Sequence, residues 1–144
     1  MNEVLSRNGE LGSSACEILA TAINAVNPYQ IIQQIVRKSE QNLWIGEDAY
    51  PLHEIERIFL IGFGKASVPM MKALLDVLGG EVFLAECVTK NNKFLDEAGY
   101  LGKLHVHLGG HPIPTQASLV ATKAVLEKCK GITRKDLVLV VISG

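Results

Sequence analysis

Residues 57–65 have the sequence Arg-Ile-Phe-Leu-Ile-Gly-Phe-Gly-Lys, and this stretch decides the predicted fold. Its first part is a short, almost continuously apolar run, which is typical of a strand covered on both faces in a parallel sheet. Gly62-Phe63-Gly64 then supplies a turn, and residues 65–78 carry apolar side chains at helical spacing. A strand, a glycine turn and a helix in this order indicate a β-α-β unit.

The same alternation of strand-length apolar runs and helical patterns continues along the chain. We expect strands at 57–62, 82–88, 104–108 and 137–142, and helices at 65–78 and 115–130. Before the first strand we expect helices at 13–26 and 28–38 and a surface connection at 39–56. The sequence therefore predicts a Rossmann-like, three-layer α/β domain with a mainly parallel sheet and two N-terminal helices. Because such domains usually continue after a fourth strand, we expect residues 1–144 to be truncated within their domain.

The composition excludes several classes of protein. Hydrophobic residues make up 48% of the 144 residues and charged residues 20%, which is enough to build a core. The net charge is -1 with no basic stripe, which argues against a nucleic acid or an anionic membrane as partner. The longest apolar runs are too short to span a bilayer, and the N-terminus does not resemble a signal peptide. A cytoplasmic protein is expected, with Cys16, Cys87 and Cys129 as small hydrophobic side chains in a reducing compartment.

The first candidate site is the turn after the strand at 57–62. Gly62 and Gly64 would let an anionic group approach the backbone, and Lys65 adds a positive charge at the start of the next helix. The stretch is not a Walker A loop, because Phe59 and Ala66 stand where that motif needs glycine and serine or threonine. A tight turn with a solvated lysine is the alternative interpretation.

The second candidate site is Gly109-Gly110-His111-Pro112, between the third strand and the following helix. Two glycines permit close approach of a ligand, and the prolines stiffen the loop. A rigid turn with an exposed histidine is the alternative. His105 and His107 alternate within the preceding strand and therefore share one face, where packing is a better explanation than a metal site.

Two further stretches end strands of the same predicted sheet. Ser143-Gly144 follows the fourth strand, and a small hydroxyl residue beside glycine suits a phosphate-binding turn. Lys90 follows the second strand, although a solvated polar loop also explains residues 89–93. Because parallel strands bring their carboxyl ends to one edge, Lys65, His111 and Ser143 are expected to converge there, with glycine amides facing an anion.

A dinucleotide-binding domain, or a sugar-phosphate-binding domain, is the alternative function. Gly62 and Gly64 fit the first two positions of the dinucleotide fingerprint, whereas Ser67 replaces its third glycine. Glu86 is the candidate ribose-binding acid, but it precedes Cys87-Val88 and does not end its strand.

These motifs, in this order, resemble the N-terminal domain of the glycerate 2-kinase family. The resemblance is carried by Ile61-Gly62-Phe63-Gly64-Lys65-Ala66, Val88-Thr89-Lys90, Gly109-Gly110-His111-Pro112 with Pro114, and Asp136-Leu137-Val138 leading to Ile142-Ser143-Gly144. It covers nearly all of this chain but about a third of a family member. Asn91-Asn92 departs from the stretch that many members have there.

The resemblance implies ATP-dependent phosphorylation of D-glycerate at its 2-hydroxyl, with magnesium. It also implies a Rossmann-like N-terminal domain, a smaller C-terminal domain absent from residues 1–144, and an active site between the two. Lys65 matches the family's functional lysine and would neutralise charge on the phosphoryl group or on the glycerate carboxylate. The chain alone is therefore expected to be inactive, with D-glycerate and ATP as small-molecule partners of the whole enzyme and a homo-oligomer as an open alternative to a monomer.

Overall fold

A five-stranded sheet forms the centre of the computed structural model, which describes residues 9–90 and 100–143. Its strands are β4 (Arg57–Phe63), β5 (Val82–Thr89), β6 (Tyr100–Leu101), β7 (Leu104–Leu108) and β8 (Asp136–Ile142). They lie in the order β6-β7-β5-β4-β8, and all neighbouring pairs are parallel except β6 with β7. The pairing of Ile58 with both Val82 and Leu137 confirms the mainly parallel sheet.

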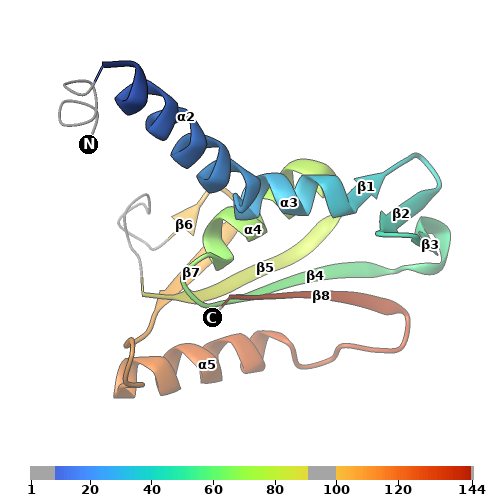
Figure 1. Ribbon diagram of the computed structural model, residues 1–144. Helices are drawn as coiled ribbons and strands as arrows, with labels where there is room; N and C mark the ends of the chain where they lie inside the picture. Colours follow the sequence, from blue (N-terminus) through green and yellow to red (C-terminus); the bar gives the residue numbers. More distant parts are fainter. Residues whose placement is uncertain (1–8, 91–99, 144) are drawn as a thin grey trace.

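Helices cover both faces of this sheet, which confirms the predicted three-layer, Rossmann-like α/β fold (Figure 1). Helices α3 (Pro28–Ile35) and α4 (Ser67–Leu78) lie on one face, and α5 (Gln116–Lys128) lies on the other. The larger core fills the space under α4, where Leu60, Met71, Leu74 and Leu104 are almost completely buried. This packing holds the carboxyl ends of β4, β5 and β7 at one edge of the sheet.

Helix α5 begins and ends close to the residues that the sequence predicted. Thr115 caps the helix in a capping box with Ser118, as the sequence predicts for a helix that starts after Thr115. The helix ends at Lys128, two residues earlier than expected, and Gly131 follows with a φ of 82°. A left-handed conformation of this kind is one that glycine adopts without strain.

The N-terminal third of the chain differs from the prediction. Helix α2 (Gly9–Ala25) begins four residues early, and α3 ends at Ile35, so residues 36–38 are not helical. Strands β1 (Val36–Lys38), β2 (Asn42–Ile45) and β3 (Asp48–Pro51) form an antiparallel sheet, followed by a 3-10 turn (Leu52–Glu54), where a surface connection was expected. The prediction was wrong because these strands are too short for a periodic pattern, and their stability comes from burying Val36 and Leu43 against the core.

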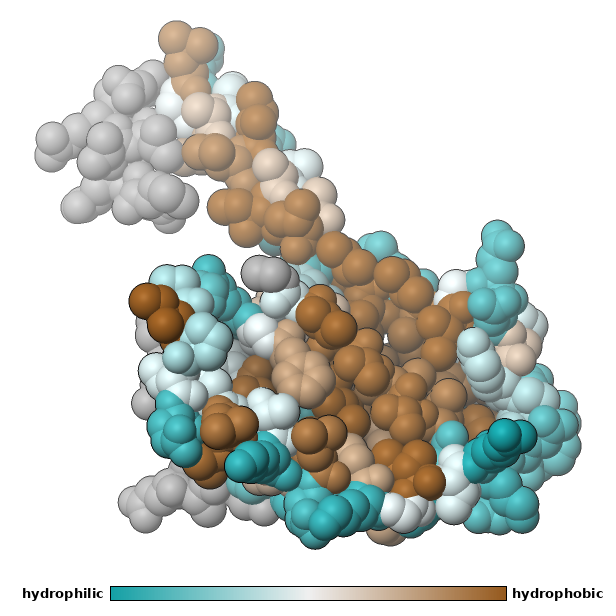
Figure 2. Space-filling model, turned by 90° about the horizontal axis from the view of Figure 1, so that it is seen from below, coloured by the Kyte–Doolittle hydropathy of each residue, from teal (hydrophilic) through white to brown (hydrophobic). Residues whose placement is uncertain are grey.

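Two apolar surfaces remain uncovered within the described residues. Strand β8 is the edge of the sheet, and Val140 and Ile142 are 51% and 71% exposed. Figure 2 shows apolar side chains gathered on the side of the molecule viewed there and along the projecting helix α2, which exposes Leu11, Ile18 and Ile23. None of the described helices combines the length and the apolar character that crossing a membrane requires. All three cysteines are free thiols; Cys87 is buried, whereas Cys16 and Cys129 are partly exposed.

Candidate functional site

The carboxyl ends of β4, β5 and β7 surround a cavity of about 220 Å³. The residues that line it come from the ends of the three strands, from the loop before α5 and from the first turn of α5. They are Phe63, Gly64, Lys65, Val88, Thr89, Lys90, Gly109, Gly110, His111, Pro114 and Ser118. The structure therefore brings Lys65, Lys90 and His111 to one place, although they are separated by up to 46 positions in the sequence.

The turn after β4 is built around Gly64 and Ser143. Gly64 has a φ of 102°, and a Cβ atom there would overlap the carbonyl group of Ser143. The Ser143 hydroxyl accepts a hydrogen bond from the backbone amide of Ala66 at 2.8 Å, and the Ser143 amide donates to the carbonyl of Phe63 at 2.9 Å. Ser143 thus packs against the back of the turn and is not part of the cavity lining.

The loop after β7 is held by Ser118, which the sequence did not single out. Its hydroxyl accepts hydrogen bonds from the backbone amides of Gly110 at 2.8 Å and Thr115 at 3.1 Å. A Cβ atom on Gly110 would lie 2.5 Å from Cγ2 of Thr115, so glycine is needed for this close approach. The capping-box spacing Thr-x-x-Ser is the signal that could have identified Ser118. Pro112, another predicted site residue, is not part of the lining.

The glycine amides are already used within the protein, which corrects the expectation that they face an anion. The amide of Gly64 donates to the carbonyl of Val88 at 3.0 Å, and the amide of Gly109 donates to the carbonyl of Thr89 at 2.9 Å. With the Gly110 amide bonded to Ser118, these three donors extend the sheet and fix the loops. An anion in the cavity would therefore be held mainly by side chains.

The side chains that line the cavity are positively charged or neutral. Lys65 and Lys90 are exposed, and no aspartate or glutamate is among the described lining residues. Loss of hydration and then the charges of Lys65 and Lys90 lower the pKa of His111. Lys65, Lys90 and His111 line the same cavity, so a bound anion would offset the positive charges of the two lysines.

Thr89 adds a hydroxyl group that has no hydrogen-bond partner within the described part of the chain. Its side chain is almost completely buried at the end of β5 and lines the cavity. A buried hydroxyl is rarely left without a partner, because the loss of its bonds to water costs free energy. The sequence places Thr89 in a polar loop and gives no signal that its hydroxyl is buried at the cavity.

Gly62, one of the predicted site glycines, does not line the cavity. Gly62 lies inside β4, where an added Cβ atom would be 2.8 Å from Cγ of Met71 and 3.2 Å from Sγ of Cys87. Its small size therefore serves the packing of α4 on the sheet. Gly144 lies outside the described residues, as do Asn91 and Asn92.

Glu86 is not placed to bind a ribose, which argues further against a dinucleotide-binding domain. Its side chain is 1% exposed, and its oxygens lie 2.6 Å from Nε2 of His107 and 2.6 Å from Nζ of Lys128. These contacts keep the carboxylate on the face of the sheet that α5 covers. Burial is also the main reason that the pKa of His105 is lowered.

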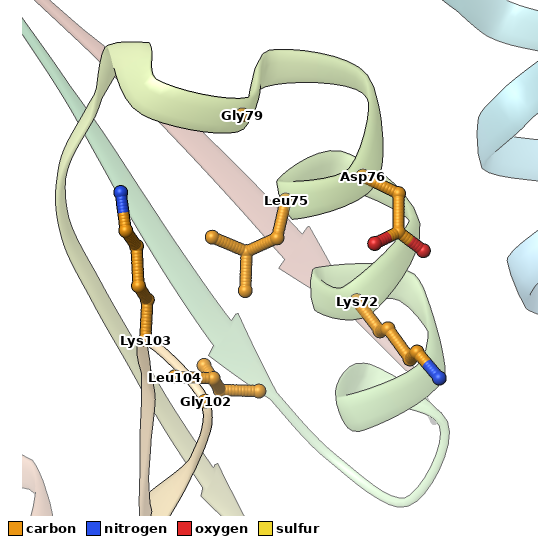
Figure 3. Close-up of a pocket in the computed structure, with 7 residues that line it drawn as sticks. All are labelled: Lys72, Leu75, Asp76, Gly79, Gly102, Lys103 and Leu104. Atoms are coloured by element: carbon orange, nitrogen blue, oxygen red, sulfur yellow. The ribbon is translucent and has the colours of Figure 1, made fainter.

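A larger hollow of about 390 Å³ lies between α4 and the turn that joins β6 to β7 (Figure 3). Leu75 and Leu104 form its apolar part, and Figure 3 shows Leu75 pointing toward the turn while Lys72 points away. It lies at the amino end of β7, whereas ligands of open α/β sheets bind at the carboxyl ends of the strands. The smaller cavity at Lys65 is therefore the better candidate.

Comparisons with known proteins agree with this fold and with the sequence motifs. A family model described as Domain of unknown function (DUF4147) matches residues 14–144. The chain is 28% identical over 130 residues to a D-glycerate 2-kinase of Thermotoga maritima and 26% identical over 146 residues to a glycerate kinase of Rattus norvegicus. These matches cover 90% and 93% of this chain, but 27% and 28% of the relatives.

Solved structures show the same similarity. A crystal structure of a glycerate kinase from Thermotoga maritima matches with a TM-score of 0.67 and 28% identity, covering 90% of this chain and 27% of that one. A crystal structure of a Pyrococcus horikoshii protein matches with a TM-score of 0.72 and 24% identity over 90% of this chain and 28% of that one. The resemblance predicted from the motifs is confirmed, and the chain spans about a quarter of the length of these relatives.

Proposed function

The chain belongs to the DUF4147 family, and on this basis we propose that it is the N-terminal part of an ATP-dependent glycerate 2-kinase. The reaction would transfer the terminal phosphoryl group of ATP to the 2-hydroxyl of D-glycerate and produce 2-phosphoglycerate. Both substrates carry negative charge near the reacting atoms. The observation that supports this function is the convergence of Lys65, Thr89, Lys90 and His111 at one cavity on the sheet edge.

Each of these side chains has a role that its chemistry permits. Lys65 and Lys90 would balance the charge of a phosphoryl group or a carboxylate, and Lys65 is our candidate for the catalytic lysine. The hydroxyl of Thr89, which has no other partner among the described residues, would donate a hydrogen bond to the same anion. Ser118 and the loop glycines would hold the cavity open in this shape.

Magnesium is expected with ATP, but the described lining does not fit a magnesium site. Mg²⁺ prefers oxygen ligands from carboxylates and phosphates, and no carboxylate is present among the described residues around the cavity. The fit is to the anionic part of a substrate, so we assign no step and no described residue to the metal ion.

The 144-residue chain should not turn over substrate alone. Phosphoryl transfer depends on positioning both substrates and on stabilising charge from several sides. The cavity is open to solvent, and the groups that line it come from the carboxyl edge of this one sheet. We expect the purified chain to give no 2-phosphoglycerate from D-glycerate and ATP, and robust turnover that is lost in Lys65→Ala would contradict this part of the proposal.

The binding function can be tested on the chain as it is. We would titrate the wild type, Lys65→Ala, Thr89→Val and Lys72→Ala with sulfate, D-glycerate and ATP. Loss of one charge-assisted contact costs about 1.5–3 kcal/mol, so Lys65→Ala should bind the anions at least about tenfold more weakly. Lys72 is a control because it lies on α4, away from the cavity. Anion binding that is equal in Lys65→Ala and the wild type would overturn the proposed site.

A further inference from the structure

A second cluster of chemically active side chains lies away from the cavity, between the sheet and α5. Glu86 of β5 pairs with His105 of β7 across the parallel register, and His107 is two residues further along the same strand. The Oε2 atom of Glu86 is 2.6 Å from Nε2 of His107 and 3.2 Å from Nδ1 of His105. The donor atoms of the three residues all lie within 4.8 Å of one another.

The donor set and its spacing match a particular class of metal ion. Two imidazole nitrogens and one carboxylate oxygen are ligands that Zn²⁺ and similar first-row ions accept, at bond lengths of about 2.0–2.2 Å. Tetrahedral bonds of this length separate neighbouring donor atoms by about 3.3–3.6 Å. The 3.2 Å between Oε2 of Glu86 and Nδ1 of His105 is close to this value, the 2.6 Å between Oε2 and Nε2 of His107 would have to widen, and the donor atoms of the two histidines lie within 4.8 Å of each other.

Because Glu86 is buried, its carboxylate requires a positively charged partner. A carboxylate that is 1% exposed is costly unless a positive group compensates it. In the structure this group is Lys128, whose Nζ lies 2.6 Å from Oε1 of Glu86 and 3.1 Å from Nδ1 of His105. The ammonium group therefore uses acceptors that a metal ion would use.

Lys128 can also leave without disturbing the sheet. It is the last residue of α5, and its side chain is 39% exposed, so rotation of the flexible stem would carry the ammonium group into water. We propose that Glu86, His105 and His107 form a binding site for a zinc-type divalent transition-metal ion, with Lys128 as an internal competitor that occupies the site when the metal is absent. This site is separate from the proposed kinase cavity and does not depend on that function.

The test is a titration of the metal-free purified chain with Zn²⁺ and with Co²⁺, whose visible absorption reports its ligands. The wild type should bind one equivalent, and Lys128→Met should bind about tenfold or more tightly because the competing charge is removed. Glu86→Gln and His105→Gln should each weaken binding at least about tenfold, since each loses a ligand. His53→Gln, which changes an exposed histidine outside the cluster, should bind like the wild type.

The outcomes are distinct even if one variant folds poorly. Circular dichroism identifies a variant that does not fold, and His105→Gln replaces Glu86→Gln in that case because His105 is the more exposed of the two. Failure of the wild type to bind one equivalent of either ion would overturn the proposal, whatever Lys128→Met does. Binding that is unchanged in His105→Gln, or that Lys128→Met does not strengthen, would overturn it as well and leave an ion-pair network that holds α5 on the sheet.

Discussion

The hydroxyl of Ser143 accepts a hydrogen bond of 2.8 Å from the backbone amide of Ala66, which lies 77 positions earlier in the chain. This contact joins the end of β8 to the start of α4. It anchors the backbone directly after Lys65, although the Lys65 side chain itself is exposed. Ser143 thus acts on the candidate site through the backbone, without lining the cavity.

Replacement of Ser143 by alanine should loosen this turn. The Ala66 amide would lose its partner, and we expect the free energy of unfolding to fall by about 0.5–1.5 kcal/mol. Urea unfolding of Ser143→Ala would measure the change, with Ser13→Ala on the exposed side of α2 as a control. Equal stability of Ser143→Ala and the wild type would show that the hydrogen bond contributes nothing to the turn.

Adding a side chain at Gly64 should lower the stability of the protein far more than adding one at Gly131, whose backbone conformation is similar. Gly64→Ala combines a φ of 102° with a clash against the Ser143 carbonyl, whereas Gly131 has a φ of 82° and open space around it. We expect Gly131→Ala to cost about 1–2 kcal/mol from backbone strain and Gly64→Ala clearly more. Thermal unfolding of the two variants compares them, and similar losses would contradict the close packing of Gly64 on Ser143.

Sulfate binding should strengthen at acidic pH because of His111. Loss of hydration and the charges of Lys65 and Lys90 lower the pKa of His111, and a bound anion would offset those charges and raise it again. Linkage then requires the affinity for sulfate to increase as the pH falls toward the lowered pKa of His111 and this residue gains a proton. Calorimetric titrations at several pH values would measure this increase.

The histidine responsible can be identified by substitution. His111→Gln should remove most of the pH dependence of sulfate affinity, and His53→Gln should keep it, because His53 lies outside the cavity. A pH dependence that survives in His111→Gln would assign the effect to another group. Sulfate is the suitable probe here, since its charge stays constant over this pH range.

The ion pair between Arg57 and Asp136 should make stability depend on pH under acidic conditions. Arg57 donates to both carboxylate oxygens of Asp136 at 2.8 and 2.7 Å, and these bonds, with those from Thr133, hold the pKa of Asp136 well below its usual range. A depressed pKa adds stability that is present above the unfolded pKa of about 3.9 and is lost as the pH falls toward the folded value. Asp136→Asn should therefore be less stable than the wild type at pH 7.

The difference between the two proteins should shrink as the pH drops below about 4, because the wild type then loses the same charge. Urea unfolding at pH 7 and at several acidic values would follow it, with Asp48→Asn, an exposed aspartate of β3, as the control. A difference that stays constant down to the lowest pH would mean that Asp136 acts through its shape and not through its charge.

The exposed edge of the sheet should cause the 144-residue chain to self-associate. Val140 and Ile142 project from β8, which has no further strand beside it among the described residues. Light scattering at tens of micromolar should detect species larger than a monomer, since contacts of this kind reach about micromolar affinity. Replacing both residues by threonine should reduce association, whereas Val120→Thr on α5 should not, and a monomeric wild type would contradict the prediction.

Periodicity alone predicted the sheet because its signals are local. β4, β5 and β8 are each long enough to show a run dominated by apolar residues, and β7 alternates apolar residues with His105 and His107. The glycine after β4 and the threonine before α5 mark the turns. The short strands β1, β2 and β3 have no such run, and they form because Val36 and Leu43 find a core that other parts of the chain supply. A pattern of three or four residues cannot report a contact with distant residues.

For the candidate site, too, one part followed from the sequence and another part only from the tertiary structure. The sequence determined that Lys65, Lys90 and His111 follow parallel strands, and that topology brings them to one edge of the sheet. Only the tertiary structure decided which hydrogen-bond donors remain available there. The amides of Gly64 and Gly109 are bonded to carbonyls of β5, the amide of Gly110 is bonded to Ser118, and the Thr89 hydroxyl is buried without a partner among the described residues. The physical reason is that a residue type fixes what a group can donate or accept, whereas its partners are fixed by segments that are distant in the chain and meet after folding.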